Sequence, residues 1–130
     1  MSHWTTVKTE FKSLTHLEAA AQELGLKMEV ALVGKSVTAI GYSGNKRECH
    51  AKISGKRFQY DIAIDKNADG TFGLTTDWYD GKEKIVGKDF KKLNQLYAVH
   101  TTMAAVKAKG WTATKRTLKD GTIQVVACGM

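Results

Sequence analysis

Three side chains could take part in acid–base chemistry. His3 lies close to the N-terminus, and Asp61 and Asp77 each stand in an alternating run of residues beside aromatic side chains. An imidazole and two carboxylates gathered in one cleft can act as a general acid and a general base. The alternative is that His3 is a hydrogen-bonded strand residue and that both aspartates are ordinary surface charges. We favour this alternative, because no motif of a nucleophilic enzyme accompanies the three residues.

Metal-binding patterns are weak. Residues 65–70 match the first half of a calcium-binding loop, but Thr76 stands where that loop needs a bidentate glutamate. The Asp-Gly pair within this stretch is also the usual signal of a tight hairpin turn, which is the interpretation we favour. Cys49 and His50 are neighbours on a predicted strand and therefore point to opposite faces. We expect no metal site, no cofactor and no catalytic set, and we expect Cys49 and Cys128 to be reduced.

Positive charge is concentrated at one end of the chain. The 130 residues include 20 Lys and Arg against 13 Asp and Glu, a formal net charge of +7. Residues 91–130 hold 7 of these basic residues and 1 acid, whereas the rest of the chain is nearly balanced. A helix dipole can account for cations at a helix C-terminus, but it gives no reason for those in the hairpin that follows. The partner-binding residues that we predict are Lys91, Lys92, Lys107, Lys109, Lys115, Arg116 and Lys119.

A second basic cluster lies in the first half of the chain. Glycines precede it, as in loops that hold an anion, but no helix follows whose dipole could face that anion. We therefore predict a weak anion-binding site. Its residues are Lys46, Arg47, Lys52, Lys56 and Arg57.

Periodicity predicts the elements that position these residues. Spacings of three and four predict a short helix at about 16–24 and a largely buried helix of about 20 residues that ends at Gly110. A capping box beginning at Thr15 would start the first helix. Apolar alternation and turn residues predict the strands. Those strands lie at about 5–11, 28–33, 36–43, 49–53, 57–64, 72–78, 111–118 and 122–128.

The order of these elements indicates one α+β domain over residues 1–130. We expect an antiparallel sheet of about five to seven strands with two helices packed on one face. A ferredoxin-like core with extra strands is the first topology expected. No apolar run is long enough to span a membrane, and the N-terminus lacks the features of a signal peptide. The compartment expected is therefore the cytoplasm, or equally the plastid stroma or the cytoplasm of an infected host.

Several short motifs resemble those of a known family. The opening residues 1–9 are the most specific, although Trp4 stands where the family usually has Phe, and Ala63 replaces a common Gly. The other motifs are Ile40-Gly41-Tyr42, Tyr60-Asp61-Ile62, Asp69-Gly70-Thr71-Phe72, Asp77-Trp78, Leu96-Tyr97-Ala98 and Asp120-Gly121-Thr122-Ile123. With these residues the chain resembles the plastid and cyanobacterial family called hypothetical reading frame thirty-five, or domain of unknown function twelve fifty-seven. The resemblance implies a small protein of a cyanobacterial, plastid or phage setting, and it implies no particular activity.

The function expected from the sequence is that of a small basic accessory or regulatory protein, not an enzyme. Its C-terminal third would dock an acidic partner protein, with long-range attraction speeding the encounter. The alternative is non-specific RNA or DNA binding through the same residues, because a lysine-rich surface suits backbone contacts better than base reading. An enzyme that uses His3, Asp61 and Asp77 is the third hypothesis.

Overall fold

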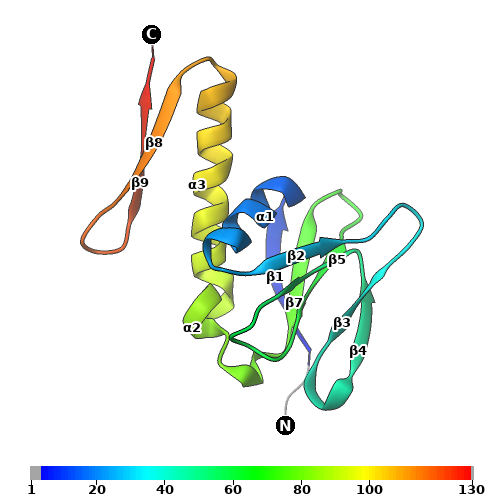
Figure 1. Ribbon diagram of the computed structural model, residues 1–130. Helices are drawn as coiled ribbons and strands as arrows, with labels where there is room; N and C mark the ends of the chain where they lie inside the picture. Colours follow the sequence, from blue (N-terminus) through cyan, green and yellow to red (C-terminus); the bar gives the residue numbers. More distant parts are fainter. Residues whose placement is uncertain (1–3, 130) are drawn as a thin grey trace.

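A five-stranded antiparallel sheet forms the centre of the protein (Figure 1). The computed structural model describes residues 4–129, and the order in this sheet is β1-β7-β6-β5-β2. Two further antiparallel pairs, β3 with β4 and β8 with β9, form separate two-stranded sheets. The bounds are β1 (Thr5–Phe11), β2 (Lys27–Val30), β3 (Val37–Ile40), β4 (Lys46–Cys49), β5 (Ala51–Ser54), β6 (Ile62–Lys66), β7 (Phe72–Thr76), β8 (Thr112–Thr117) and β9 (Ile123–Cys128).

Two helices cover one face of the five-stranded sheet. The long helices are α1 (Leu14–Glu23) and α3 (Lys91–Ala108). Leu17 of α1 and Leu93 of α3 belong to the same buried cluster as Ile53, Ile62 and Leu74 of the sheet. Burying such side chains stabilises the fold by about 1.5–3 kcal/mol each. The short helical turns are η1 (Tyr42–Gly44), η2 (Trp78–Asp80), α2 (Glu83–Val86) and η3 (Lys88–Phe90).

The opposite face of the sheet is covered by the hairpin of β3 and β4. Because side chains alternate along a strand, Ala63 points away from the helices while its neighbours Ile62 and Ile64 point toward them. Ala63 packs instead in a small buried cluster with Ala39 and Cys49 of the hairpin. The sheet is therefore enclosed on both sides.

The expected α+β class is confirmed, and so are the two helices on one face. The strand order differs from a ferredoxin-like arrangement in two respects. The strand after the second long helix, β8, pairs with β9 outside the five-stranded sheet, whereas a ferredoxin-like core returns that strand to the main sheet. β1 and β2 run in the same direction at the two edges of the sheet, and three strands, β5 to β7, lie between them. The unit β1-α1-β2 is therefore split by three consecutive antiparallel strands, whereas a ferredoxin-like fold places a single strand between the two.

Two local expectations were wrong at their boundaries. Helix α1 is capped by Ser13, whose Oγ accepts a hydrogen bond from the His16 amide at 3.3 Å, and not by Thr15. The strand expected from residue 57 begins at Ile62, because residues 55–61 form a loop. In that loop the amides of Gln59 and Tyr60 donate to the Asp80 carboxylate and are not available to a neighbouring strand.

Helix α3 is buried along its first half only. Leu93, Leu96 and Val99 are its buried residues, and Met103 and Val106 are only partly covered. The expectation of a largely buried helix was therefore wrong for the second half, because no part of the five-stranded sheet lies under it. The pair β8–β9 packs there instead, to the side of the main body (Figure 1).

Candidate functional site

The C-terminal hairpin, which we define as β8, β9 and the turn 118–122, stands outside the five-stranded sheet. Its Ala113 and Val125 are partly covered, and its other face is open to solvent. Three large apolar side chains of this region are exposed: Trp111 by 44%, Leu118 by 37% and Val126 by 47%. Neither outer strand edge is paired in the part of the chain that the structure describes. An isolated hairpin with free edges and exposed apolar residues is suited to contact with another molecule.

Polar contacts attach this hairpin to the body. Lys115 of β8 forms an ion pair with Glu23 of α1, and His100 Nε2 lies 2.8 Å from the same carboxylate. Burial raises the pKa of Glu23, but the hydrogen bonds and charges of Lys115 and His100 lower it overall. Gln95 Nε2 also donates to the Gly121 carbonyl at 3.2 Å. Lys115, expected to bind a partner, therefore has a role in holding the hairpin.

The other predicted partner-binding residues are exposed. Lys107 and Lys119 have no ion-pair partner within the described residues. Lys109 lies with its Nζ 5.9 Å from the centre of the Trp111 ring, a cation–π distance. Arg116 donates to the neighbouring Gln124 side chain and has no ion-pair partner within the described residues. We call the exposed face of the hairpin, together with these cations, the docking surface.

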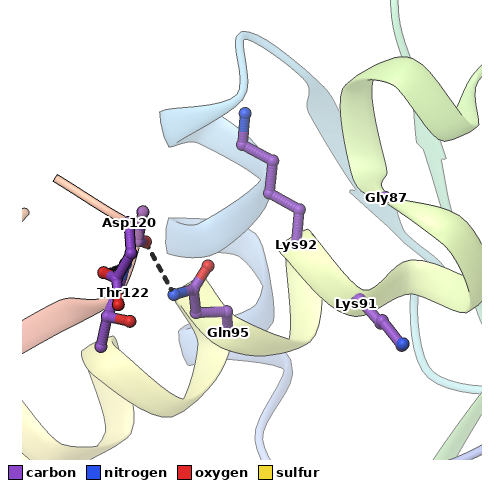
Figure 2. A pocket seen from close by; sticks show the side chains of 7 residues that line it. Gly87, Lys91, Lys92, Gln95, Asp120 and Thr122 are labelled. Carbon is purple, nitrogen blue, oxygen red and sulfur yellow. Dashed lines mark hydrogen bonds between the residues drawn. The ribbon is translucent and has the colours of Figure 1, made fainter. Parts of the chain in front are cut away.

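A shallow pocket of about 560 Å³ lies between the start of α3 and the hairpin turn. Lys91, Lys92 and Gln95 line it from the helix, and Asp120 to Thr122 line it from the turn. In Figure 2, Gln95 reaches toward the turn while Lys91 and Lys92 extend in different directions. The pocket adds two predicted partner-binding lysines to the docking surface. Their side chains do not converge on one point, so the pocket is no tight anion site.

Asp61 and Asp77 lie beside each other at one end of the sheet. The pairing of Ile62 with Thr76 places them at neighbouring ends of β6 and β7. Asp61 accepts a hydrogen bond from the Ile40 amide at 2.9 Å, and Asp77 caps η2 by accepting from the Tyr79 amide at 2.9 Å. Both carboxylates thus have structural partners. The third member of the hypothesis, His3, lies outside the described residues.

The same end of the sheet holds a buried ion pair. The side chain of Lys82 is 0% exposed, and its Nζ lies 2.9 Å from Asp80 Oδ1. It also donates to the Asp77 carbonyl, and the rings of Phe58 and Tyr60 lie 5.3 and 5.8 Å from it. Burial lowers the pKa of Lys82, against the opposing influence of the nearby aspartates. Sequence reasoning missed this residue, because a lysine between Gly81 and Glu83 has the pattern of an ordinary surface charge.

The second basic cluster does not form one anion site. Arg47 pairs with Asp65 at 2.7 Å, and Lys52 Nζ donates to the Thr38 carbonyl at 3.0 Å, both on the outer face of the sheet. These two side chains are engaged within the protein, and the structure does not bring them together with the other three. Lys46 is exposed elsewhere, at the start of β4. Lys56 and Arg57 lie apart from them, in the loop after β5.

The suspected calcium loop is a hairpin turn. Asp69 Oδ1 accepts hydrogen bonds from the amide and the hydroxyl of Thr71, and the Gly70 amide donates to the Asn67 carbonyl. These bonds close the turn between β6 and β7, as we expected from the Asp-Gly pair. Within residues 4–129, no three His, Cys, Asp or Glu side chains are grouped so that they could hold a metal ion.

Fold and surface together define a small α+β protein with a basic, exposed hairpin beside its main sheet. The chain belongs to the family described as Protein of unknown function (DUF1257), whose model matches residues 20–126. No curated protein and no solved structure matches it. Among the helices that the structure describes, none has both the length and the hydropathy to cross a membrane.

Proposed function

We propose that this protein is a non-enzymatic accessory or regulatory protein that docks an acidic partner protein through its C-terminal third. The observation that carries the proposal is the C-terminal hairpin, which is basic, exposed and outside the main sheet. No acid lies between Asp89 and Asp120 in the sequence. Of the seven predicted partner-binding cations, only Lys115 has an ion-pair partner, Glu23, among the described residues. Such a surface attracts an acidic partner over roughly one Debye length, about 8–10 Å in physiological salt.

The mixture of residues on the docking surface favours a protein partner. Val126 is an exposed apolar residue on the open face of the hairpin, and Trp111 is an exposed aromatic residue at its start, beside Lys109. Arg116 and Lys119 are exposed cations of the same hairpin. Protein interfaces combine an apolar centre rich in aromatic residues with a polar rim. A duplex backbone would use the cations but would gain little from the apolar side chains.

The pocket between α3 and the hairpin turn extends this surface. Lys91 and Lys92 line it from α3 and their side chains extend in different directions, so each can meet a separate carboxylate of an acidic segment (Figure 2). The resemblance to the plastid and cyanobacterial reading frame thirty-five suggests the setting. We propose that the protein works in the cytoplasm, the plastid stroma or the cytoplasm of an infected host, and that no membrane is its partner.

Matched charge reversals test the proposal. Arg116→Glu with Lys119→Glu changes the docking surface, and Lys12→Glu with Lys35→Glu changes the net charge equally at exposed positions elsewhere. Fluorescence anisotropy then measures the binding of a labelled polyglutamate peptide over a salt series. We expect the first pair to weaken binding about tenfold more than the second, since each close charge contact contributes about 1 kcal/mol or more. Equal losses would show that the asymmetry affects solubility only.

A labelled oligothymidylate in the same series tests the alternative. If it binds more tightly than polyglutamate and its binding is lost with the first pair of substitutions, the docking surface binds nucleic acid and not protein. The same two pairs of substitutions test a partner protein captured from the native host. Its recovery must fall with Arg116→Glu and Lys119→Glu and remain with the control pair.

A further inference from the structure

A cluster of three tyrosines is formed by η1, η2 and the loop 55–61, none of which belongs to the docking surface. Tyr42 of η1 contacts both Tyr60 and Tyr79, with ring centres 6.1 and 6.3 Å apart and edge-to-face geometry. Tyr79 is 71% exposed and Tyr42 is 42% exposed, so their rings contribute little to the core. Grouped aromatic rings on a surface have a cost in solubility and are typical of binding sites.

Basic residues lie directly beside these rings. A pocket of about 490 Å³ is lined by Lys56, Arg57, Gln59, Tyr60 and Tyr79 among others, and we call it the tyrosine pocket. A neighbouring groove of about 620 Å³ shares Lys56 and Arg57 and adds Lys27. The volume of the tyrosine pocket falls within the range of small-ligand sites, about 300–1,000 Å³. One pocket thus offers an aromatic wall and two cations.

The single carboxylate in the lining does not oppose an anion. Asp80 pairs with the buried Lys82, whose Nζ lies 2.9 and 3.0 Å from its two oxygens. The amides of Gln59 and Tyr60 occupy one of those oxygens as well. Since this carboxylate is compensated from inside, the field in the tyrosine pocket is set by Lys56 and Arg57. The buried pair also holds the loop 55–61 against η2, which fixes the two walls of the pocket.

Two cations, Lys56 and Arg57, are shared by the tyrosine pocket and the neighbouring groove. Arg57 lines both the tyrosine pocket and the neighbouring groove, and its guanidinium donates to the Leu24 carbonyl at 2.7 Å, beside Gly25 of that groove. A phosphate would therefore lie where the two hollows adjoin. Lys56 is exposed and has no ion-pair partner within the described residues. Guanidinium and ammonium groups both bind phosphate by charge-assisted hydrogen bonds.

We propose that the tyrosine pocket binds a nucleotide unit, with a base stacked on Tyr79 and its phosphate on Lys56 and Arg57. The exposed amide of Gln59 lies in the same lining and can meet the polar edge of the base. Base stacking on aromatic side chains together with basic side chains is the general mode of single-strand recognition. The ligand is either a free mononucleotide or one residue of a single-stranded nucleic acid. This site shares no lining residue with the docking surface and goes beyond the function proposed above.

Binding measurements on full-length protein test the inference with two probes, thymidine monophosphate by NMR titration and labelled oligothymidylate by anisotropy. Tyr79→Ala should weaken oligothymidylate binding about tenfold, the usual effect of losing one stacked base. Tyr79→Phe keeps the ring and should bind within about twofold of the wild type, because it preserves the stacking. Because Tyr79 is exposed, neither change should affect folding, which circular dichroism can verify.

A charge control separates the site from general attraction. Lys56→Gln and Lys66→Gln each remove one exposed positive charge, and Lys66 lies on β6, outside the pocket lining. Lys56→Gln should weaken binding and reduce the log–log salt slope by about one, and Lys66→Gln should not. Perturbed signals of residues 56–60 with the monophosphate would assign a mononucleotide, whereas binding of the oligomer alone would assign a single strand.

Three results would overturn the inference. These are no binding of either probe at low salt, equal binding by Tyr79→Ala and the wild type, or equal losses from Lys56→Gln and Lys66→Gln. The fate of the proposed function is separate, because Tyr79→Ala should leave polyglutamate binding unchanged. A protein that binds polyglutamate and no nucleotide would retain the docking surface and lose only this site.

Discussion

Removing the buried ammonium of Lys82 is the sharpest perturbation that the structure offers. Lys82 and Asp80 have side chains that are 0% and 2% exposed, and the oxygens of Asp80 also accept from the amides of Gln59 and Tyr60. Lys82→Met fills similar space with an apolar chain but removes every hydrogen bond that the amine donates. The Asp80 carboxylate then stays in the interior without its counter-charge.

The expected cost is large for a protein of this size. Breaking a buried ion pair by removing one partner destabilises by about 3–5 kcal/mol, because an uncompensated charge remains. Total stabilities are about 5–15 kcal/mol, so this is a third or more of a typical value. The melting temperature should fall by about 10–20 °C. Adding Asp80→Asn removes the stranded charge and keeps an oxygen for the two loop amides, so the double variant should recover at least about 1 kcal/mol.

Urea unfolding, followed by tryptophan fluorescence at neutral pH, measures these free energies. If Lys82→Met does not fold, the free energies of unfolding of Asp80→Asn and of the double variant are compared instead, and this comparison still tests the buried ion pair. The reasoning is refuted if Lys82→Met lies within about 1 kcal/mol of the wild type. It is also refuted if the double variant is destabilised by the full sum of the single changes, since coupled charges must be non-additive.

The pH dependence of stability gives an independent check on Lys82. Burial lowers its pKa below the ordinary 10.5, so the folded protein releases this proton at a lower pH than the unfolded chain does. Between the two pKa values the unfolded state binds more protons, and the free energy of unfolding therefore rises with pH. We expect this rise in the wild type and its absence in Lys82→Met. Parallel profiles for the two proteins would contradict the assignment.

Three further predictions concern other parts of the molecule. Cys128 is exposed and should react readily with an aromatic disulfide. Burial shields Cys49 and raises its pKa, so Cys49 should react only in denaturant. Equal reaction rates of the two thiols under native conditions would contradict this prediction. Glu23→Gln should speed hydrogen exchange in the C-terminal hairpin by up to about fivefold, as expected for the loss of a partly exposed ion pair. Because the pKa of Glu23 is lowered, the wild type should lose the same protection as the pH falls through that lowered value, and unchanged exchange would argue against the contact. Gly87→Ala should lower the free energy of unfolding in urea by more than about 2 kcal/mol, because φ is +84° and a Cβ would come within 2.6 Å of a backbone nitrogen. The control is Gly81→Ala, where φ is +77° but the space is open, and this change should cost about 1 kcal/mol.

The sequence was informative where the structural signal is local. Alternation predicted β1 and the C-terminal hairpin, and the Asp-Gly pair predicted the turn between β6 and β7. Spacings of three and four predicted α3, which begins at Lys91 and ends at Ala108. Each of these signals depends on residues that lie close together in the sequence, so short-range periodicity is enough to predict the element.

The sequence did not predict the structure where two segments that are distant in the chain meet. The loop at 55–61 looks like a strand, because its alternation of Phe58 and Tyr60 with polar residues is genuine. Its course is decided by Asp80, some 20 residues later, which accepts the amides that a strand would use. The exposure of the second half of α3 is likewise decided by the width of a sheet formed elsewhere in the chain. Lys82 shows the same limit, because its burial depends on Phe58 and Tyr60 of the loop 55–61 and on Trp78 of η2.

The separation of the two candidate surfaces has a consequence for their energetics. The docking surface is formed by the C-terminal hairpin and α3, whereas the tyrosine pocket is formed by the loop 55–61 and η2. Sites without shared residues change binding free energies additively, usually within about 0.5 kcal/mol. Occupation of the pocket should therefore leave the affinity for an acidic probe nearly unchanged, apart from the charge that a phosphate adds. A larger effect would require a structural element whose equilibrium both sites bias. The candidate element is α2, which joins Lys82, the partner of Asp80, to Gly87 in the lining of the other pocket.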